Sequence, residues 1–115
     1  MPDDQFIRGI PRPITSSGSG DFSIGSKLWP GVSKVIEEMG ELQQVLGKLI
    51  AVAGETKHWD GDLRPRLIEE IGDLRAALVF FQAENFTPDE SQQVVERTEK
   101  KIALFRKWHR TQNKP

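Results

Sequence analysis

The sequence predicts an all-α fold, a helical bundle with three main helices in each chain. Apolar residues recur at steps of three and four residues through most of the chain after residue 28, which is the spacing of one face of an α-helix. Pro, Thr and Gly residues stand where such helices would begin and end. No stretch carries convincing strand signals. The 115 residues are enough for one domain of this kind.

The first 25 residues differ from the rest in composition. They are rich in Pro and Gly and include the stretch TSSGSGDFS at 15–23. This composition favours loop or disorder over regular structure. We therefore expect a flexible or extended N-terminal arm over residues 1–25 and a helical domain over residues 26–115.

The first helix is predicted to follow LWPG at 28–31. Pro30 suits a first helical turn, where its missing N–H does no harm, and Gly54 is a plausible stop. The apolar stripe that defines this helix consists of Val32, Val35, Ile36, Met39, Leu42, Leu46, Leu49, Ile50 and Ala53.

Two further helices are predicted after a loop at 55–62. The second has its apolar stripe between Leu63 and Phe81, with Pro65 in the first turn, and AENF at 83–86 is expected to break it. The third begins at TPDE, 87–90, where Thr87 serves as N-cap and Glu90 closes a capping box.

The composition excludes several classes of protein. Lys and Arg total 16 and Asp and Glu total 17, a balance that argues against a general binder of nucleic-acid polymers. The absence of Cys excludes a disulfide framework and a thiolate metal site, and it fits a reducing cytoplasm. No apolar run approaches the length of a membrane span. We expect a cytoplasmic protein without a membrane partner.

Two nearly identical acidic stretches lie in the first and second predicted helices. They are IEEMGEL at 36–42 and IEEIGDL at 68–74. Residues three and four apart share a face of a helix, so Glu38 aligns with Glu41, and Glu70 aligns with Asp73. Both pairs border the apolar stripe. If the two helices pack antiparallel, four carboxylates converge near mid-helix in a partly desolvated place.

Converging carboxylates repel one another, by about 1 kcal/mol per close pair in water and by more at lower dielectric. Such a cluster must take up protons or bind cations. Ligand sets made only of oxygen select hard divalent ions, here Mg²⁺ with Mn²⁺ as a substitute, and such sites typically handle phosphates. The alternative is that these are solvated surface glutamates, which are common on helices, and the spacing alone leaves both interpretations open.

EEMGEL at 37–42 followed by EEIGD at 69–73 resembles the E-E-x-x-E … E-x-x-D signature of the MazG-type all-α nucleoside triphosphate pyrophosphatases. The resemblance extends from LWPG at 28–31 to KWH at 107–109. It implies a helical bundle that forms a homo-dimer or homo-tetramer. It also implies hydrolysis of (d)NTPs between the α and β phosphates, for housecleaning or regulation of nucleotide pools.

The resemblance also implies roles for individual residues. Glu38, Glu41, Glu70 and Asp73 would be the Mg²⁺ ligands, with Glu37 as an auxiliary acid that orients or deprotonates the attacking water. Glu69 would be a solvated neighbour. An asparagine common in the third helix of the family has no obvious match here, which puts the phosphate and sugar contacts in doubt. The family also binds phosphates with Lys and Arg of the third helix, for which the candidates here are Arg97, Lys100, Lys101 and Arg106. Lys48 is a further candidate, because it lies two turns after Glu41 on the same face of the first helix. The alternative for each of these cations is an exposed charge that contributes only to solubility.

Trp29, just before the first helix, is the candidate for stacking on the base, because an aromatic face accepts any purine or pyrimidine. The alternative is that Trp29 packs within the protein or at an interface. The apolar residues of the first two helices outnumber what one partner helix covers. We therefore expect homo-oligomerisation to complete a four-helix arrangement. The rival hypothesis is a noncatalytic helical dimerisation or regulatory module whose acids are surface charge.

Overall fold

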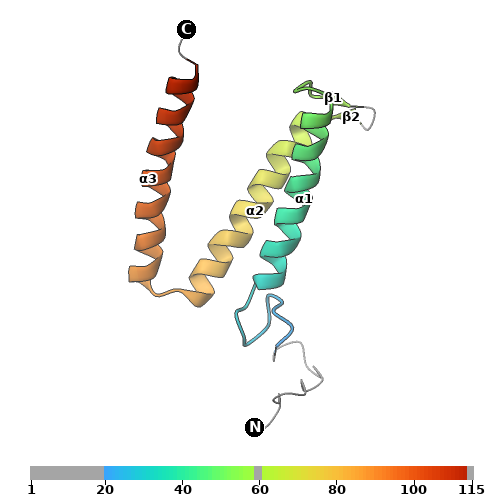
Figure 1. The fold of residues 1–115 in the computed structure, drawn as a ribbon. Helices are drawn as coiled ribbons and strands as arrows, with labels where there is room; N and C mark the ends of the chain where they lie inside the picture. Colours follow the sequence, from blue (N-terminus) through green and yellow to red (C-terminus); the bar gives the residue numbers. More distant parts are fainter. Residues whose placement is uncertain (1–19, 59–60, 114–115) are drawn as a thin grey trace, which may run out of the picture. The chain divides into compact units, whose positions relative to one another are not determined.

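The computed structural model describes residues 20–58 and 61–113. Its elements are α1 (Val32–Ala51), β1 (Lys57–His58), β2 (Gly61–Asp62), α2 (Leu63–Asn85) and α3 (Pro88–Gln112) (Figure 1). The all-α prediction is confirmed, with three main helices as expected. Residues 1–19 of the predicted arm over 1–25 lie outside the described part of the chain.

The chain divides into two compact units, Met1–Glu84 and Asn85–Pro115. In the first, α2 runs back beside α1, so the two helices form an antiparallel hairpin (Figure 1). The second unit is α3 with the turn that precedes it. The acidic stretches of the sequence therefore both belong to the hairpin.

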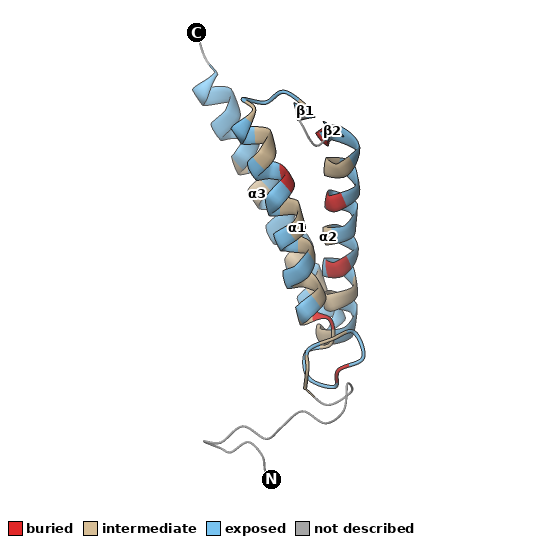
Figure 2. Cartoon of the chain, turned by 90° about the vertical axis from the view of Figure 1, so that its right-hand side faces the viewer, coloured by how far each residue is buried: buried red, intermediate tan, exposed pale blue. Residues whose placement is uncertain are grey.

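The hairpin has a narrow interior. Val45, Leu63 and Ala77 are its buried apolar residues among those described, and Glu70 is buried with them. Figure 2 shows the buried positions of α2 along one side of the helix, toward α1. A carboxylate thus occupies a place that small and branched apolar side chains otherwise fill.

The start of α1 differs from the prediction that Pro30 lies in its first turn. The helix begins at Val32, and the N-cap is Gly31 with φ of 93°. The preceding segment folds back, so that the carbonyls of Ser23 and Phe22 accept the N–H groups of Gly31 and Ser33, both at 2.9 Å. A Cβ added at Gly31 would lie 2.9 Å from Phe80 Cδ2, so this close approach to α2 requires glycine.

The end of α1 is a Schellman turn. The N–H of Gly54 donates to the carbonyl of Leu49 at 2.9 Å, and the N–H of Ala53 donates to that of Ile50 at 3.0 Å. Gly54 therefore belongs to the turn that ends the helix, as predicted. The left-handed residue where such turns usually carry glycine is Ala53, however, with φ of 56°.

The predicted loop at 55–62 contains a short antiparallel ladder. Lys57 pairs with Asp62 and His58 with Gly61, and Asp62 Oδ1 then accepts the N–H of Arg64 at 3.0 Å in the first turn of α2. The break expected at AENF is confirmed, because α2 ends at Asn85, within that stretch. Ala and Glu are good helix formers, so the helix still includes the first residues of AENF.

The predicted capping box of α3 is confirmed. The side chain of Thr87 accepts the N–H of Glu90 at 3.1 Å, and Glu90 Oε1 accepts the N–H of Thr87 at 2.9 Å. Pro88 follows at the first helical position. These local signals fix where α3 begins without any contribution from tertiary packing.

Replacing Ala53 with Gly should stabilise the hairpin by about 0.5–1 kcal/mol, because glycine adopts the left-handed conformation without the Cβ clash. Thermal unfolding followed by circular dichroism should show a higher Tm. The matched control is Ala51→Gly, inside the last turn of α1, which should lower the Tm. A lower Tm for Ala53→Gly would contradict the assigned turn.

Candidate metal centre

Three carboxylates from two helices meet inside the hairpin. Glu38 and Glu41 lie one turn apart on α1, and Glu70 lies on α2. One oxygen from each lies within 4.8 Å of the others. The structure thus brings together three of the four residues predicted to be metal ligands.

Two oxygens of this group are buried without a hydrogen-bond partner in the described part of the chain. They are Glu38 Oε1 and Glu70 Oε1. Glu70 is 8 % exposed, and the side chain of Glu38 is 14 % exposed. A buried carboxylate without a partner is costly, and a bound proton or cation would relieve this cost.

The surroundings raise the pKa of both buried carboxyls. For Glu70 the main cause is burial, followed by the negative charges of Glu41 and Asp73. For Glu38 the causes are again burial and then the charges of Glu41 and Asp73, opposed in part by the positive charge of Lys34. Burial and like charge both disfavour the ionised form, which is the condition that cation binding relieves.

The donor set fits a hard divalent cation. Mg²⁺ is bound by carboxylate oxygens and usually retains water or phosphate oxygens in its remaining positions. Glu38, Glu41 and Glu70 offer three carboxylates and no nitrogen or sulfur, so they suit Mg²⁺ or Mn²⁺ better than Zn²⁺ or Cu²⁺. The unpartnered oxygens are what such an ion would bind.

Asp73, the fourth predicted ligand, is exposed and does not belong to the group of three. It lies one turn after Glu70 and is close enough to raise the pKa of Glu38 and Glu70. It also lines a neighbouring cavity together with Glu38. Its role as a ligand remains a prediction.

The cavity beside the carboxylates has a volume of about 310 Å³. It belongs entirely to the first unit, and its lining combines apolar side chains with three charged ones. Two alanines leave room where larger side chains would fill the space. Its lining residues are Ile24, Lys34, Glu38, Asp73, Ala76, Ala77 and Phe80.

Lys34 is absent from the sequence-based predictions, although the sequence contains a signal for it. It precedes Glu37 by three residues and Glu38 by four, the spacing of neighbours on a helix. Its Nζ lies 2.9 Å from Glu37 Oε1 and 4.0 Å from Glu38 Oε2. Glu37 is exposed and lies outside the group of three, while Glu69 is exposed as expected.

The predicted phosphate-binding cations are divided between the two units, with Lys48 in the first and the others in the second. Lys48 is half-buried on α1 and does not line the cavity. Lys101 Nζ lies 5.0 Å from the centre of the Phe105 ring and 5.8 Å from that of Trp108, on its own helix. Arg97 and Lys101 line a larger apolar hollow of about 620 Å³ on the second unit. Lys100 and Arg106 are exposed on α3. Their roles remain predictions.

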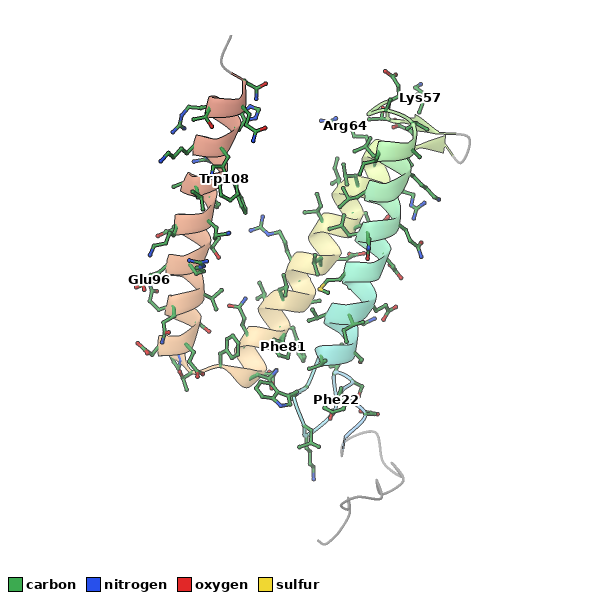
Figure 3. The ribbon with its side chains drawn as sticks, viewed as in Figure 1. Phe22, Lys57, Arg64, Phe81, Glu96 and Trp108 are labelled. Carbon is green, nitrogen blue, oxygen red and sulfur yellow. The ribbon has the colours of Figure 1, made fainter. Side chains whose placement is uncertain are left out.

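Trp29, the candidate for base stacking, stacks on Phe81 with ring centres 6.0 Å apart and planes 17° apart. Figure 3 shows Phe81 near the end of α2, at the same end of the hairpin as Phe22. Trp29 is still 54 % exposed and has a left-handed backbone, with φ of 46°. The Trp29 ring thus stacks on Phe81, and its contact with a base remains a prediction.

Comparison with models of known protein families, with curated proteins and with solved structures gives no significant match. Within the described residues, the helices lack a stretch long and apolar enough to cross a membrane.

The raised pKa of Glu70 predicts how stability depends on pH in the absence of divalent cations. Between the ordinary value of 4.5 and the raised value, the folded state binds more protons than the unfolded state. The free energy of unfolding should therefore fall as pH rises through this window. Glu70→Gln should raise the Tm at neutral pH and weaken this dependence, because it removes the buried charge.

The control is Glu69→Gln, an exposed neighbour on the same helix, which should change the Tm little. Thermal unfolding across a pH series without divalent cations measures both variants. Equal changes in Tm for the two variants at neutral pH would show that the charge of Glu70 does not destabilise the folded state.

Proposed function

We propose that this protein is a Mg²⁺-dependent nucleotide pyrophosphohydrolase that cleaves (d)NTPs between the α and β phosphates to a monophosphate and pyrophosphate. The observation that carries the proposal is the convergence of Glu38, Glu41 and Glu70, with two buried oxygens lacking partners. The adjoining cavity supports it, because a substrate there would lie beside Glu38 and Asp73, which both line it.

Glu38, Glu41 and Glu70 would hold the cation, with Asp73 as the proposed fourth ligand. When bound, the cation neutralises charge on the phosphates and makes a coordinated water more acidic. The oxygen of the attacking water bonds to phosphorus, the bridging P–O bond breaks, and pyrophosphate leaves. Glu37 lies outside the group of three, so it is the carboxylate that we propose to orient this water and accept its proton.

The competing hypothesis is a noncatalytic helical module with solvated acids. Glu37 and Glu69 fit that description, since both are exposed. Glu70 does not, because its Oε1 is buried and no partner satisfies it within the described residues. The buried carboxylate therefore favours the metal-dependent enzyme, which we place in the cytoplasm and in housecleaning or regulation of nucleotide pools.

We further propose that the chain forms a homo-dimer or homo-tetramer. The hairpin leaves large apolar side chains exposed on both helices: Ile36 (62 %), Ile50 (79 %), Ile68 (66 %) and Val79 (65 %). A second copy that covers these residues would complete a four-helix arrangement.

Light scattering coupled to size-exclusion chromatography should give the mass of two or four chains of 13.0 kDa. Ile50→Glu should shift the protein toward monomer, because it places a charge in the covered face. Glu55→Gln, an exposed change just beyond α1, is the control. A wild-type protein that stays monomeric at micromolar concentration would refute the assembly.

The activity is tested with a panel of nucleotides, in which malachite green detects phosphate after added pyrophosphatase. Release should require Mg²⁺. Glu41→Gln should reduce turnover by about a hundredfold or more, because a ligand is lost, while helicity remains and the Tm does not fall. Glu69→Gln is the control and should keep most of the activity. Absence of turnover for the whole panel would favour the noncatalytic module.

A further inference from the structure

Lys34 is the one lysine among the residues that line the cavity beside the carboxylates. Its ammonium forms an ion pair with Glu37 at 2.9 Å and approaches Glu38 Oε2 at 4.0 Å. The other oxygen of that carboxylate, Oε1, is the one without a partner. Lys34 therefore lies beside the carboxylate group and leaves its unpartnered oxygens available.

The ion pair that holds Lys34 is weak and exposed. Its side chain is 40 % exposed, and that of Glu37 is 53 % exposed, so solvent screens their attraction. A lysine ammonium sits on a flexible four-carbon stem and can exchange one anionic partner for another. A divalent cation bound at Glu38 would repel the ammonium from this carboxylate and would leave it beside the cavity.

We propose that Lys34 is the phosphate-binding cation of this site: its ammonium exchanges Glu37 for a phosphate oxygen when a divalent cation occupies the carboxylates. This inference rests on the proposed function, because it assigns the substrate contact of the same site. It places the required positive charge on α1, four residues before Glu38. The cations on α3 are then not needed for this contact.

The test uses the full chain with two probes, Mn²⁺ alone and inorganic pyrophosphate. The variants are Lys34→Met, which removes the charge and keeps the stem, and Lys34→Arg, which keeps the charge. Lys27→Met, at an exposed lysine outside the cavity lining, is the matched control. Circular dichroism melting checks that each variant is folded.

Lys34→Met should bind Mn²⁺ about three- to tenfold more tightly than the wild type, because a nearby positive charge is gone. The same variant, loaded with Mn²⁺, should bind pyrophosphate about tenfold or more weakly, because a charged hydrogen bond is lost. Lys34→Arg and Lys27→Met should differ little from the wild type. Opposite changes in the two affinities are expected only if the Lys34 ammonium lies near the cation site and contacts the phosphate.

Unchanged pyrophosphate affinity in Lys34→Met would overturn the inference, as would changes of the same sign for both probes. If the wild type hydrolyses nucleotides and Lys34→Met still binds pyrophosphate normally, the function stands and the role of Lys34 falls. If no nucleotide is hydrolysed but the opposite changes are observed, the role of Lys34 stands and the proposed reaction falls.

Discussion

The structure depends on one electrostatic constraint, which is the meeting of three carboxylates inside a two-helix hairpin. Glu70 occupies a buried position of α2, and Glu38 and Glu41 approach it from α1 within 4.8 Å. Apolar side chains would pack this interior at less cost, since buried like charges disfavour the folded state. The three carboxylates together strongly favour binding of a cation at this point, and the proposed function depends on that cation.

The ends of the hairpin hold the two acidic stretches in register. At one end Gly31 lets α1 approach Phe80 closely, and the segment before it caps the first turn with backbone carbonyls. At the other end a Schellman turn and a two-residue ladder lead directly into Leu63, a buried residue at the start of α2. A close packing contact at one end and hydrogen bonds at the other therefore hold the helices so that the carboxylates oppose each other despite their repulsion.

Local signals in the sequence predicted most of the fold. The box at Thr87 and Glu90 is self-contained, so it could be identified without tertiary information. The end of α2 was also predictable, because the apolar periodicity stops at AENF and the helix ends at Asn85, within that stretch. The left-handed conformation of Ala53 could not be predicted, because this turn usually carries glycine at that position.

The part of the site that follows from helical spacing could be predicted from the sequence. Spacing aligns Glu38 with Glu41 and Glu70 with Asp73, but it does not say which side of α2 faces α1. The rotation of α2 buries Glu70 and leaves Asp73 exposed beside the cavity. The same spacing places Lys34 beside Glu37 and Glu38, so its position could also have been predicted. The cavity could not, because tertiary packing brings Ile24 to the side chains of α2 that line it.

The most direct test of the metal site is anomalous diffraction from crystals soaked in Mn²⁺. The account predicts a peak about 2.0–2.3 Å from oxygens of Glu38, Glu41 and Glu70. Carboxylates turned toward solvent in the complete assembly, with no peak between them, would contradict it.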